Sequence, residues 1–334
     1  MGTDHRLDVA WQRDPRETQT MKSVYMTQPD TEAPLDALRV GDLPLPEHRE
    51  GWTTVQVQAA SLNHHDVWSL RGVGISTARL PLILGCDAAG VDDSGREVLV
   101  YPVIDDGATR SVLSERYHGA FAEYVSVPRE NLVAIPEGMT ISEAACMPTA
   151  WLTAYKMLFT RAQIEAGDLV LVQGASGGLS TALVMLASAA GARVWVTGRS
   201  AAARAFAVAV GAEATFETDE RLPERVDHVM DSVGAVTWNH SLKSLKAGGT
   251  MVVPGATSGY EATINIALIF AKQLSILGTS MGSLSELTAL LQFCVEHDLH
   301  PPIGQSFPLS DAVEAFRALQ DGPTSGKILL IPNA

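Results

Sequence analysis

The sequence predicts an α/β protein of two domains, in which an all-β domain accompanies a doubly wound domain built on a parallel sheet. Three observations lead to this fold class. Short strand-like runs broken by Pro and Gly fill residues 22–145, and strands alternate with helices over residues 146–281. A glycine-rich turn joins the first strand and helix of the second region. At 334 residues the chain has room for two domains of ordinary size.

The first region has the texture of a compact barrel or sandwich. Alternation typical of a strand begins after Met21 and recurs at residues 54–59, 97–101 and 122–127. The polar residues 1–20 that precede it contain no apolar run. We therefore expect them to form a disordered N-terminal extension without a secretory signal.

The second region begins with a short apolar run at residues 168–173, which suits a strand buried on both faces. The helices expected next each end before a glycine, Gly191 or Gly211, at the position where a left-handed residue closes a helix. The elements expected after that first strand are helix 179–190, strand 193–197, helix 201–210, and strands 226–231, 250–253 and 274–277. Such alternation calls for a parallel sheet with right-handed crossovers.

The last part of the chain is expected to return to the first domain. It consists of an amphipathic helix at residues 284–296 and a final strand at residues 327–331. The predicted boundaries are therefore 21–145 with 282–334 for the first domain and 146–281 for the second.

Composition limits the partners and the compartment. Lys and Arg number 24 against 38 Asp and Glu, and the resulting net charge of −14 repels nucleic acids and acidic membranes. The three cysteines, Cys86, Cys146 and Cys294, are scattered and form no C-x-x-C pair, which excludes a four-thiolate zinc site. Sparse cysteine and the absence of a long apolar span predict a cytoplasmic protein that does not bind membranes.

The glycine-rich turn carries the strongest functional signal. It runs Gly174, Ala175, Ser176, Gly177, Gly178, Leu179, directly between a predicted strand and a predicted helix. Glycines there permit a tight turn and a close approach to a pyrophosphate, whose charge the free N–H groups at the helix N-terminus bind. This context predicts dinucleotide binding. The alternative is a turn needed only for helix–sheet packing.

The end of the second strand indicates which dinucleotide binds. An NAD site usually has an acid about twenty residues beyond the loop, where this chain has Gly198, Arg199 and Ser200, with Arg204 following. A guanidinium binds a 2′-phosphate through two hydrogen bonds. We predict NADPH as the cofactor, bound by Arg199, Ser200 and Arg204. The alternative is that Arg199 is a solvated loop residue.

Several segments together resemble the medium-chain dehydrogenase/reductase superfamily, and within it the zinc-free, quinone oxidoreductase-like branch. The matching segments are residues 60–66, 84–90, 119–124, 148–155, the glycine loop and 255–259. The resemblance implies a GroES-like catalytic domain beside a Rossmann domain, with the active site between them. It also implies a homodimer formed through the edge strand near residues 274–277.

The resemblance bears directly on zinc. Zinc-dependent relatives place Cys, His and Cys where this chain has Asn63, Cys86 and Thr149. Asn and Thr are poor zinc ligands, so we predict no metal. An improvised site is the alternative, and its ligands would be His64, His65, Cys86 and Asp87.

The resemblance also suggests roles for individual residues. Asn63 would donate to the substrate oxygen or bind the nicotinamide ribose, although a turn or helix-cap role is the alternative. His65 has a side chain suited to relaying a proton. Thr153 would lie against the nicotinamide, and Gly255 would contact the cofactor. The aromatic residues expected to line an apolar pocket are Trp68, Tyr101, Trp151 and Phe270.

These observations predict an NADPH-dependent reductase that transfers hydride to a quinone or an α,β-unsaturated carbonyl without a metal. Conjugated acceptors suit such a site because the product anion is delocalised, whereas a simple carbonyl needs a Lewis acid. The substrate would be a small apolar or conjugated carbonyl compound. Two alternatives are a zinc-dependent alcohol dehydrogenase and a non-catalytic, crystallin-like protein that binds nucleotides or RNA.

Overall fold

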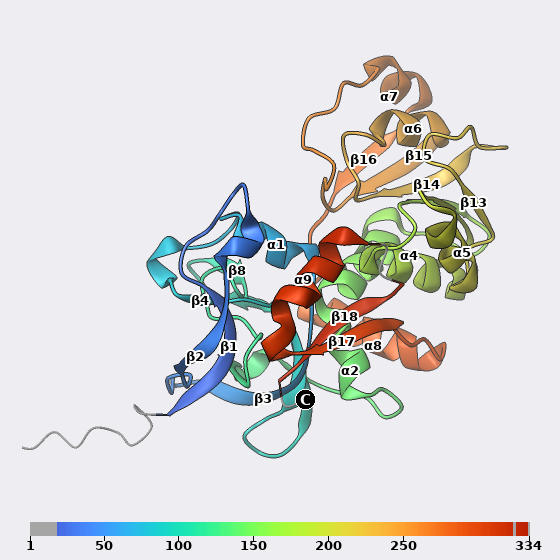
Figure 1. Cartoon of the computed structure of the whole chain (residues 1–334). Helices are drawn as coiled ribbons and strands as arrows, with labels where there is room; N and C mark the ends of the chain where they lie inside the picture. The colour runs from blue at the N-terminus through green and yellow to red at the C-terminus, as the bar shows by residue number, and fades with distance from the viewer. Residues whose placement is uncertain (1–18, 323–324, 333–334) are drawn as a thin grey trace, which may run out of the picture.

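The computed structural model describes residues 19–322 and 325–332, which form two lobes (Figure 1). Most of the predicted N-terminal extension, residues 1–18, lies outside the described residues. The first strand, β1, begins at Thr20, one residue inside the expected extension. None of the helices in the described ranges has the length and apolar character that crossing a bilayer requires.

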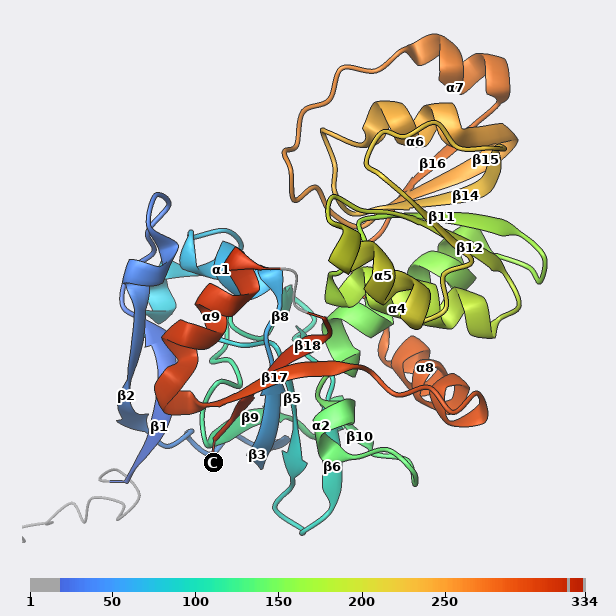
Figure 2. The same cartoon turned by 45° about the vertical axis from the view of Figure 1, so that its right-hand side comes forward.

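One lobe is built on a six-stranded parallel sheet in the order β13-β12-β11-β14-β15-β16. Its strands are β11 (Leu169–Gln173), β12 (Arg193–Thr197), β13 (Ala214–Phe216), β14 (Val226–Asp231), β15 (Leu245–Val253) and β16 (Ser275–Gly278). Helices α4 (Gly178–Ala189) and α5 (Ala201–Ala209) cover one face of this sheet, and α6 (Trp238–Ser244) and α7 (Ile266–Lys272) cover the other (Figure 2). Strand order reverses next to β11, so this is the predicted doubly wound fold.

The other lobe contains the remaining sheets. The larger one has seven strands: β3 (Trp52–Ser61), β5 (Asp87–Val91), β6 (Glu97–Val100), β9 (Tyr124–Pro128), β10 (Leu132–Ala134), β17 (Ile303–Pro308) and β18 (Lys327–Ile331). The smaller ones pair β1 (Thr20–Met26) with β2 (Leu38–Pro44) and β4 (Leu82–Ile83), and β7 (Val103–Asp105) with β8 (Arg110–Val112). Alternating burial along β3 fits a strand with one face in the core.

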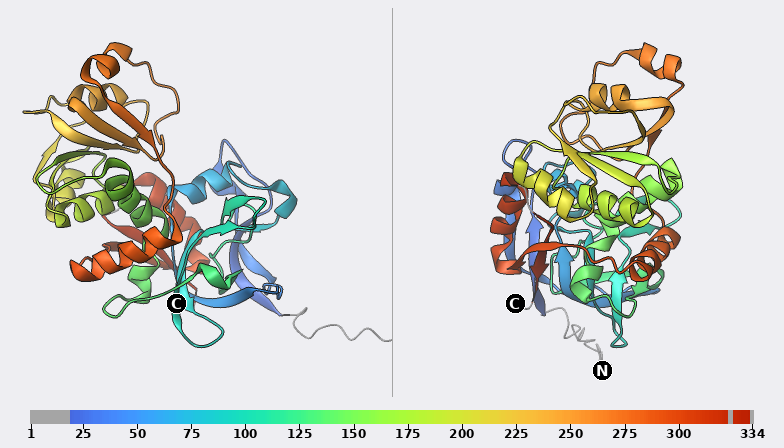
Figure 3. Two further views of the ribbon diagram at one scale, coloured as in Figure 1. Left: turned by 180° about the vertical axis from the view of Figure 1, so that it is seen from behind. Right: turned by 90° about the vertical axis from the view of Figure 1, so that its right-hand side faces the viewer.

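The chain returns to this lobe near its C-terminus. Strand β18 pairs antiparallel with β3, through Leu329 with Ser61 and Leu330 with Ala60. Helix α9 (Ala312–Asp321) covers this region, where Phe316 meets Phe121 edge-on with ring centroids 6.1 Å apart. Helix α8 (Leu284–Glu296) lies instead beside the helical segment that leads into the parallel sheet (Figure 3). The exact domain boundary at residues 281 and 282 stays a prediction.

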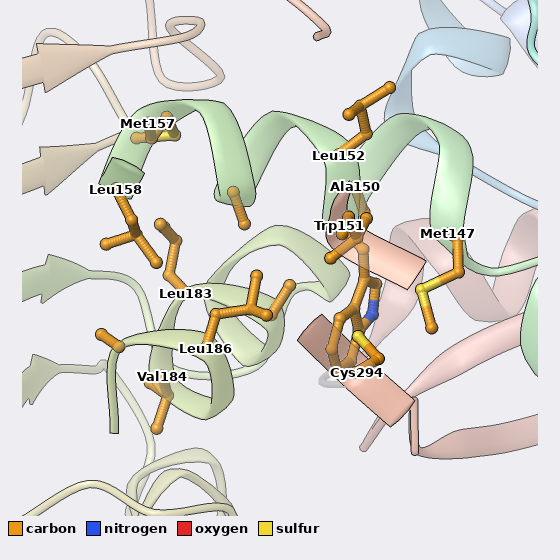
Figure 4. Packing of buried hydrophobic residues seen from close by; sticks show 14 of the residues in the cluster. Met147, Ala150, Trp151, Leu152, Met157, Leu158, Leu183, Val184, Leu186 and Cys294 are labelled. Carbon is orange, nitrogen blue, oxygen red and sulfur yellow. The ribbon is translucent and has the colours of Figure 1, made fainter. Parts of the chain in front are cut away.

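A continuous helical segment joins the two lobes. It comprises α2 (Ile141–Ala144), the π-helical turns η5 (Met147–Trp151) and η6 (Lys156–Ala162), and α3 (Leu152–Tyr155) between these turns. Trp151 is fully buried there among Met147, Cys294 of α8 and the apolar face of α4 (Figure 4). One hydrophobic cluster therefore extends through this segment, α4 and α8.

Replacing Phe316 by Ala should lower the free energy of unfolding by about 3–5 kcal/mol, because it empties a fully buried aromatic site. The matched control is Phe270→Ala on α7, where the ring is 71% exposed and the expected change is within about 0.5 kcal/mol. Urea unfolding followed by circular dichroism measures both changes. Equal effects of the two substitutions would contradict this packing.

Candidate functional site

A large cleft of about 1230 Å³ is lined by residues from both lobes. It exceeds a typical pocket for a single small molecule, so it has room for a cofactor and a substrate together. The sequence-predicted site residues that line it are Asn63, His65, Trp68, Thr153, residues 174–179, Arg199, Ser200 and Gly255.

The glycine loop follows β11 and leads into α4 at one wall of the cleft. Gly174 has a φ of +93°, a conformation that side chains disfavour. Gly177 precedes α4 without any side-chain cap, which leaves the first N–H groups of this 12-residue helix available. A Cβ on Gly178 would come within 2.9 Å of Cδ of Lys327. This cradle fits the pyrophosphate of a dinucleotide.

The end of β12 presents Arg199 and Ser200 to the same cleft. Arg199 is exposed, and the Ser200 hydroxyl accepts from the N–H of Ala203 and so caps α5. Arg204 is placed differently from the prediction. Its guanidinium donates to the carbonyl of Gly198 at 2.8 Å and pairs with Glu217 at 3.3 Å, and it does not line the cleft. Arg204 therefore braces this turn, and Arg199 is the arginine that a 2′-phosphate would meet.

The floor of the cleft is a buried polar network centred on Asp87 of β5. Its carboxylate accepts from the Thr149 hydroxyl at 2.6 Å, the Asn63 amide at 2.8 Å and the Ser61 hydroxyl at 3.2 Å. Burial raises the pKa of the Asp87 carboxyl, while the nearby Lys327 ammonium and the hydrogen bonds from Thr149 and Asn63 oppose that rise. These bonds compensate a carboxylate that has no contact with solvent.

Lys327, at the start of β18, completes the network. Its ammonium donates to Oδ1 of Asn63 at 2.6 Å and to the carbonyl of Leu62 at 2.8 Å, and it is buried at the cleft wall. The Asn63 amide also donates to the carbonyl of Ser61 at 3.2 Å, so both of its N–H groups and its oxygen have protein partners. Asn63 precedes α1 (His64–Leu70), where its backbone N–H donates to Asp66. Asn63 thus occupies the N-cap position of α1 through its backbone, while its side-chain amide donates to Asp87 and Ser61 at the cleft.

His65 lies at the cleft wall on α1. Its Nε2 is 3.3 Å from a carboxylate oxygen of Glu115, and its Nδ1 is shielded from solvent without a hydrogen-bond partner. Burial disfavours the charged imidazole, but the Cys86 sulfur and the Asp66 and Glu115 carboxylates outweigh it and raise the pKa of His65 well above its usual value. The surroundings of His65 therefore favour the protonated imidazole, with the Cys86 sulfur as the largest favourable contribution and the two carboxylates adding to it.

The donors near Cys86 do not fit a catalytic zinc. Donor atoms of His65, Asp66 and Cys86 lie within 4.8 Å of one another, but only His65 lines the cleft. A catalytic zinc needs an open position that faces the substrate. Burial and the neighbouring Asp87 and Asp66 raise the pKa of the Cys86 thiol to about 11. The Thr149 hydroxyl, where zinc-dependent relatives would place a cysteine, is engaged by Asp87.

Three of the four predicted pocket aromatics lie elsewhere. Trp151 and Tyr101 belong to the buried core, where the Tyr101 hydroxyl donates to the carbonyl of Gly282 at 2.9 Å. Phe270 is largely exposed on α7. Trp68 lines the cleft, as expected.

Sequence reasoning did not identify Lys327 or Glu115 as part of the site. Lys327 is a charged residue at the start of the apolar strand 327–331, and a buried lysine in such a place needs a partner. A lysine within this apolar run was the signal that could have identified Lys327 as a site residue. Glu115 lies in an irregular segment 50 residues from His65, and no sequence pattern links the two.

Comparison with family models matches both lobes. Residues 49–137 match the alcohol dehydrogenase GroES-like domain, and residues 178–296 match the zinc-binding dehydrogenase domain. A probable quinone oxidoreductase of Schizosaccharomyces pombe is 30% identical, over 93% of this chain and 98% of its own length.

Two solved structures are similar over nearly the whole chain. An NAD-dependent alcohol dehydrogenase is 35% identical with a TM-score of 0.85, covering 93% of this chain and 99% of that one. The 2-octenoyl-CoA carboxylase reductase CinF, in complex with NADP and 2-octenoyl-CoA, is 25% identical with a TM-score of 0.83. That match covers 93% of this chain and 87% of CinF.

Replacing Lys327 by Met should cost about 1–3 kcal/mol of stability, because it leaves the buried oxygens of Asn63 and Leu62 without a donor. It should also raise the pKa of Asp87 further. A carboxyl group whose pKa is raised on folding destabilises the folded protein once the pH exceeds the pKa of that group in the unfolded chain. The cost of Lys327→Met should therefore be larger at pH 8 than at pH 5.

Urea unfolding at the two pH values measures this cost. The control is Lys246→Met, which removes a partly exposed pair with Asp227 and should change stability by less than about 1 kcal/mol. A cost for Lys327→Met that is independent of pH would contradict the link to Asp87.

Proposed function

Because the chain belongs to the medium-chain dehydrogenase/reductase superfamily of oxidoreductases, we propose that it is an NADPH-dependent reductase of quinones or α,β-unsaturated carbonyls that works without a metal. The observation that carries the proposal is the Asp87 network. It occupies, with hydrogen bonds, the positions where the resemblance places the zinc ligands of alcohol dehydrogenases.

The substrate class follows from that network. With no Lewis acid at the cleft floor, a simple ketone gains little stabilisation of the alkoxide that its reduction produces. Reduction of a quinone or enone yields a delocalised anion, which needs less stabilisation from the protein. The S. pombe relative, named a probable quinone oxidoreductase, and CinF, which holds an enoyl-CoA, support conjugated acceptors.

The residues that would hold NADPH are those of the glycine loop, the end of β12 and the cleft wall. The N-terminus of α4 would bind the pyrophosphate, with the aliphatic part of the Lys327 side chain packed beside Gly178, and Arg199 with Ser200 would bind the 2′-phosphate. Thr153 would lie near the nicotinamide. When bound, the cofactor supplies the hydride, and the protein supplies position and exclusion of water.

NADPH rather than NADH is proposed because no acid follows β12. CinF binds NADP, whereas the alcohol dehydrogenase of the other structure is named NAD-dependent, so the relatives include both choices. Arg199, exposed at the cleft, would give a 2′-phosphate a cationic partner. This is the local positive group that an anionic cofactor requires in a chain of net charge −14.

His65 is proposed to place a positive charge on the cleft wall, where it stabilises the anion that forms on the substrate. We propose that protons reach it through the Glu115 carboxylate, because its Nδ1 is shielded from solvent and its Nε2 contacts Glu115. A homodimer formed through β16, which lies at the edge of the parallel sheet, and residence in the cytoplasm stay predictions.

Oxidation of NADPH in the presence of a panel of quinones and enones tests the proposal. Wild-type protein should prefer NADPH to NADH, and Arg199→Ala should weaken NADPH binding about 10- to 100-fold while leaving NADH binding unchanged. The control Arg221→Ala alters an exposed arginine outside the cleft and should change neither. Turnover of no acceptor, or a preference for NADH, would overturn the proposal.

The pH dependence of reduction should report on His65. The Glu115 hydrogen bond raises its pKa, so Glu115→Gln should lower that pKa and move the alkaline decline of kcat/KM to lower pH. His65→Gln should remove the decline and reduce the rate. A profile that is the same in all three proteins would exclude a role for the His65 charge.

A further inference from the structure

Helix α1 presents a stripe of side chains to the cleft. His64, Trp68 and Arg71 are spaced i, i+4 and i+7, and all three line the cleft. Arg71 is the C-cap residue of the helix, and Asn63 at the opposite end belongs to the Asp87 network. At 1.5 Å per residue, the stripe places Arg71 about 10 Å from the beginning of α1.

Among the residues that the structure describes, none forms an ion pair with the Arg71 guanidinium. It lies over the indole of Trp68, 5.0 Å from the ring centroid. Its Nε is buried and has no hydrogen-bond partner, and Arg71 forms no ion pair with another residue in the described ranges. A buried donor without a partner is costly, and a carboxylate or phosphate accepts from a guanidinium through two bonds.

Three acidic residues also line the cleft and limit where an anionic ligand can bind. The carboxylates of Glu32, Asp36 and Asp321 also line the cleft, and they repel an anionic ligand from their own surroundings. An anion that enters on this side is therefore directed toward Arg71.

An aromatic pair lies between the lobes at this part of the cleft. The rings of Trp68 and Tyr260, from the loop between β15 and α7, are 6.2 Å apart and tilted by 46°. Tyr260 is 76% exposed, so little else covers it. Flat aromatic faces of this kind contact an extended or planar chain well.

We propose that Arg71 selects substrates that carry an oxyanion, a carboxylate or a phosphate, about 10 Å from the conjugated carbonyl, because Arg71 lies about 10 Å along α1 from the end where the charge of His65 is proposed to stabilise the reduced carbonyl. The oxyanion pairs with the guanidinium, and the intervening chain lies on Trp68. The inference rests on the proposed reductase function, whose substrate class it narrows.

The test uses enones that carry a terminal carboxylate at several chain lengths, each beside its methyl ester. Wild-type protein should prefer the acid over the ester by about 10- to 100-fold in kcat/KM at the length that spans α1. Arg71→Gln should reduce this preference to about one-fold. The control Arg49→Gln removes an arginine that also lies 5.0 Å over a tryptophan, Trp52, but outside the cleft, and it should keep the preference.

A phosphate-tailed probe of the same length distinguishes the two oxyanions. In wild-type protein the oxyanion that fits Arg71 should have the higher kcat/KM, and Arg71→Lys should keep only part of the preference for either oxyanion over the ester, because lysine retains the charge but not the two parallel bonds. Equal kcat/KM values for acid, phosphate and ester in wild-type protein would overturn the inference and leave the reductase function standing.

Failure of the proposed reductase function can be distinguished from failure of the inference about Arg71. If no enone is reduced, calorimetric titration with the saturated keto acid and its ester decides the inference without turnover. Tighter binding of the acid by wild-type and Arg49→Gln proteins, but not by Arg71→Gln, would uphold it. Equal binding of acid and ester by the wild-type protein would overturn it.

Discussion

The buried carboxylate of Asp87 holds together segments that are far apart in the sequence. It accepts from Ser61 at the end of β3, from Asn63 before α1 and from Thr149 of the π-helical turn, and Asn63 in turn accepts from Lys327 of β18. A carboxylate removed from water is tolerated only when such donors are in place. The floor of the cleft therefore depends on β18, near the C-terminus, being paired beside β3 and β5.

This interaction also determines what the cleft can do. Asn63 and Thr149 are hydrogen-bonded to Asp87, so their side chains are not available as metal ligands. The floor of the cleft instead presents a hydrogen-bonded network and the Lys327 ammonium. Around it, Lys327 and Arg199 give a strongly acidic chain a local positive field toward the glycine loop. Arg71 adds a positive charge at the part of the cleft that Trp68 lines. These groups favour anionic ligands at their own parts of the cleft, away from the carboxylates of Glu32, Asp36 and Asp321.

Much of the fold could be predicted from local sequence. Strands 193–197, 226–231 and 327–331 and helix 284–296 have the bounds that the apolar runs and flanking glycines indicated. Short elements such as β13 and α6 were missed, because three to seven residues carry too little periodicity to identify a strand or a helix.

The site was predicted less completely than the fold. The glycine loop and Arg199 follow from local spacing, and the structure places both at the cleft. The contact of Lys327 with Asn63 joins residues 264 positions apart, so no local pattern reveals it. Trp68 and Trp151 look alike in sequence, yet one faces the cleft and the other is core. Only packing between elements decides which way such a ring points.

We propose that the hydrogen-bonded Asp87 network stands where zinc-dependent relatives hold their metal, and that reduction proceeds without one. The most direct test compares NADPH-driven reduction of one enone with that of its saturated ketone, using chelator-treated protein before and after zinc is added. We expect rapid reduction of the enone, none of the ketone, and no effect of zinc on either. Ketone reduction that appears on addition of zinc would contradict the account.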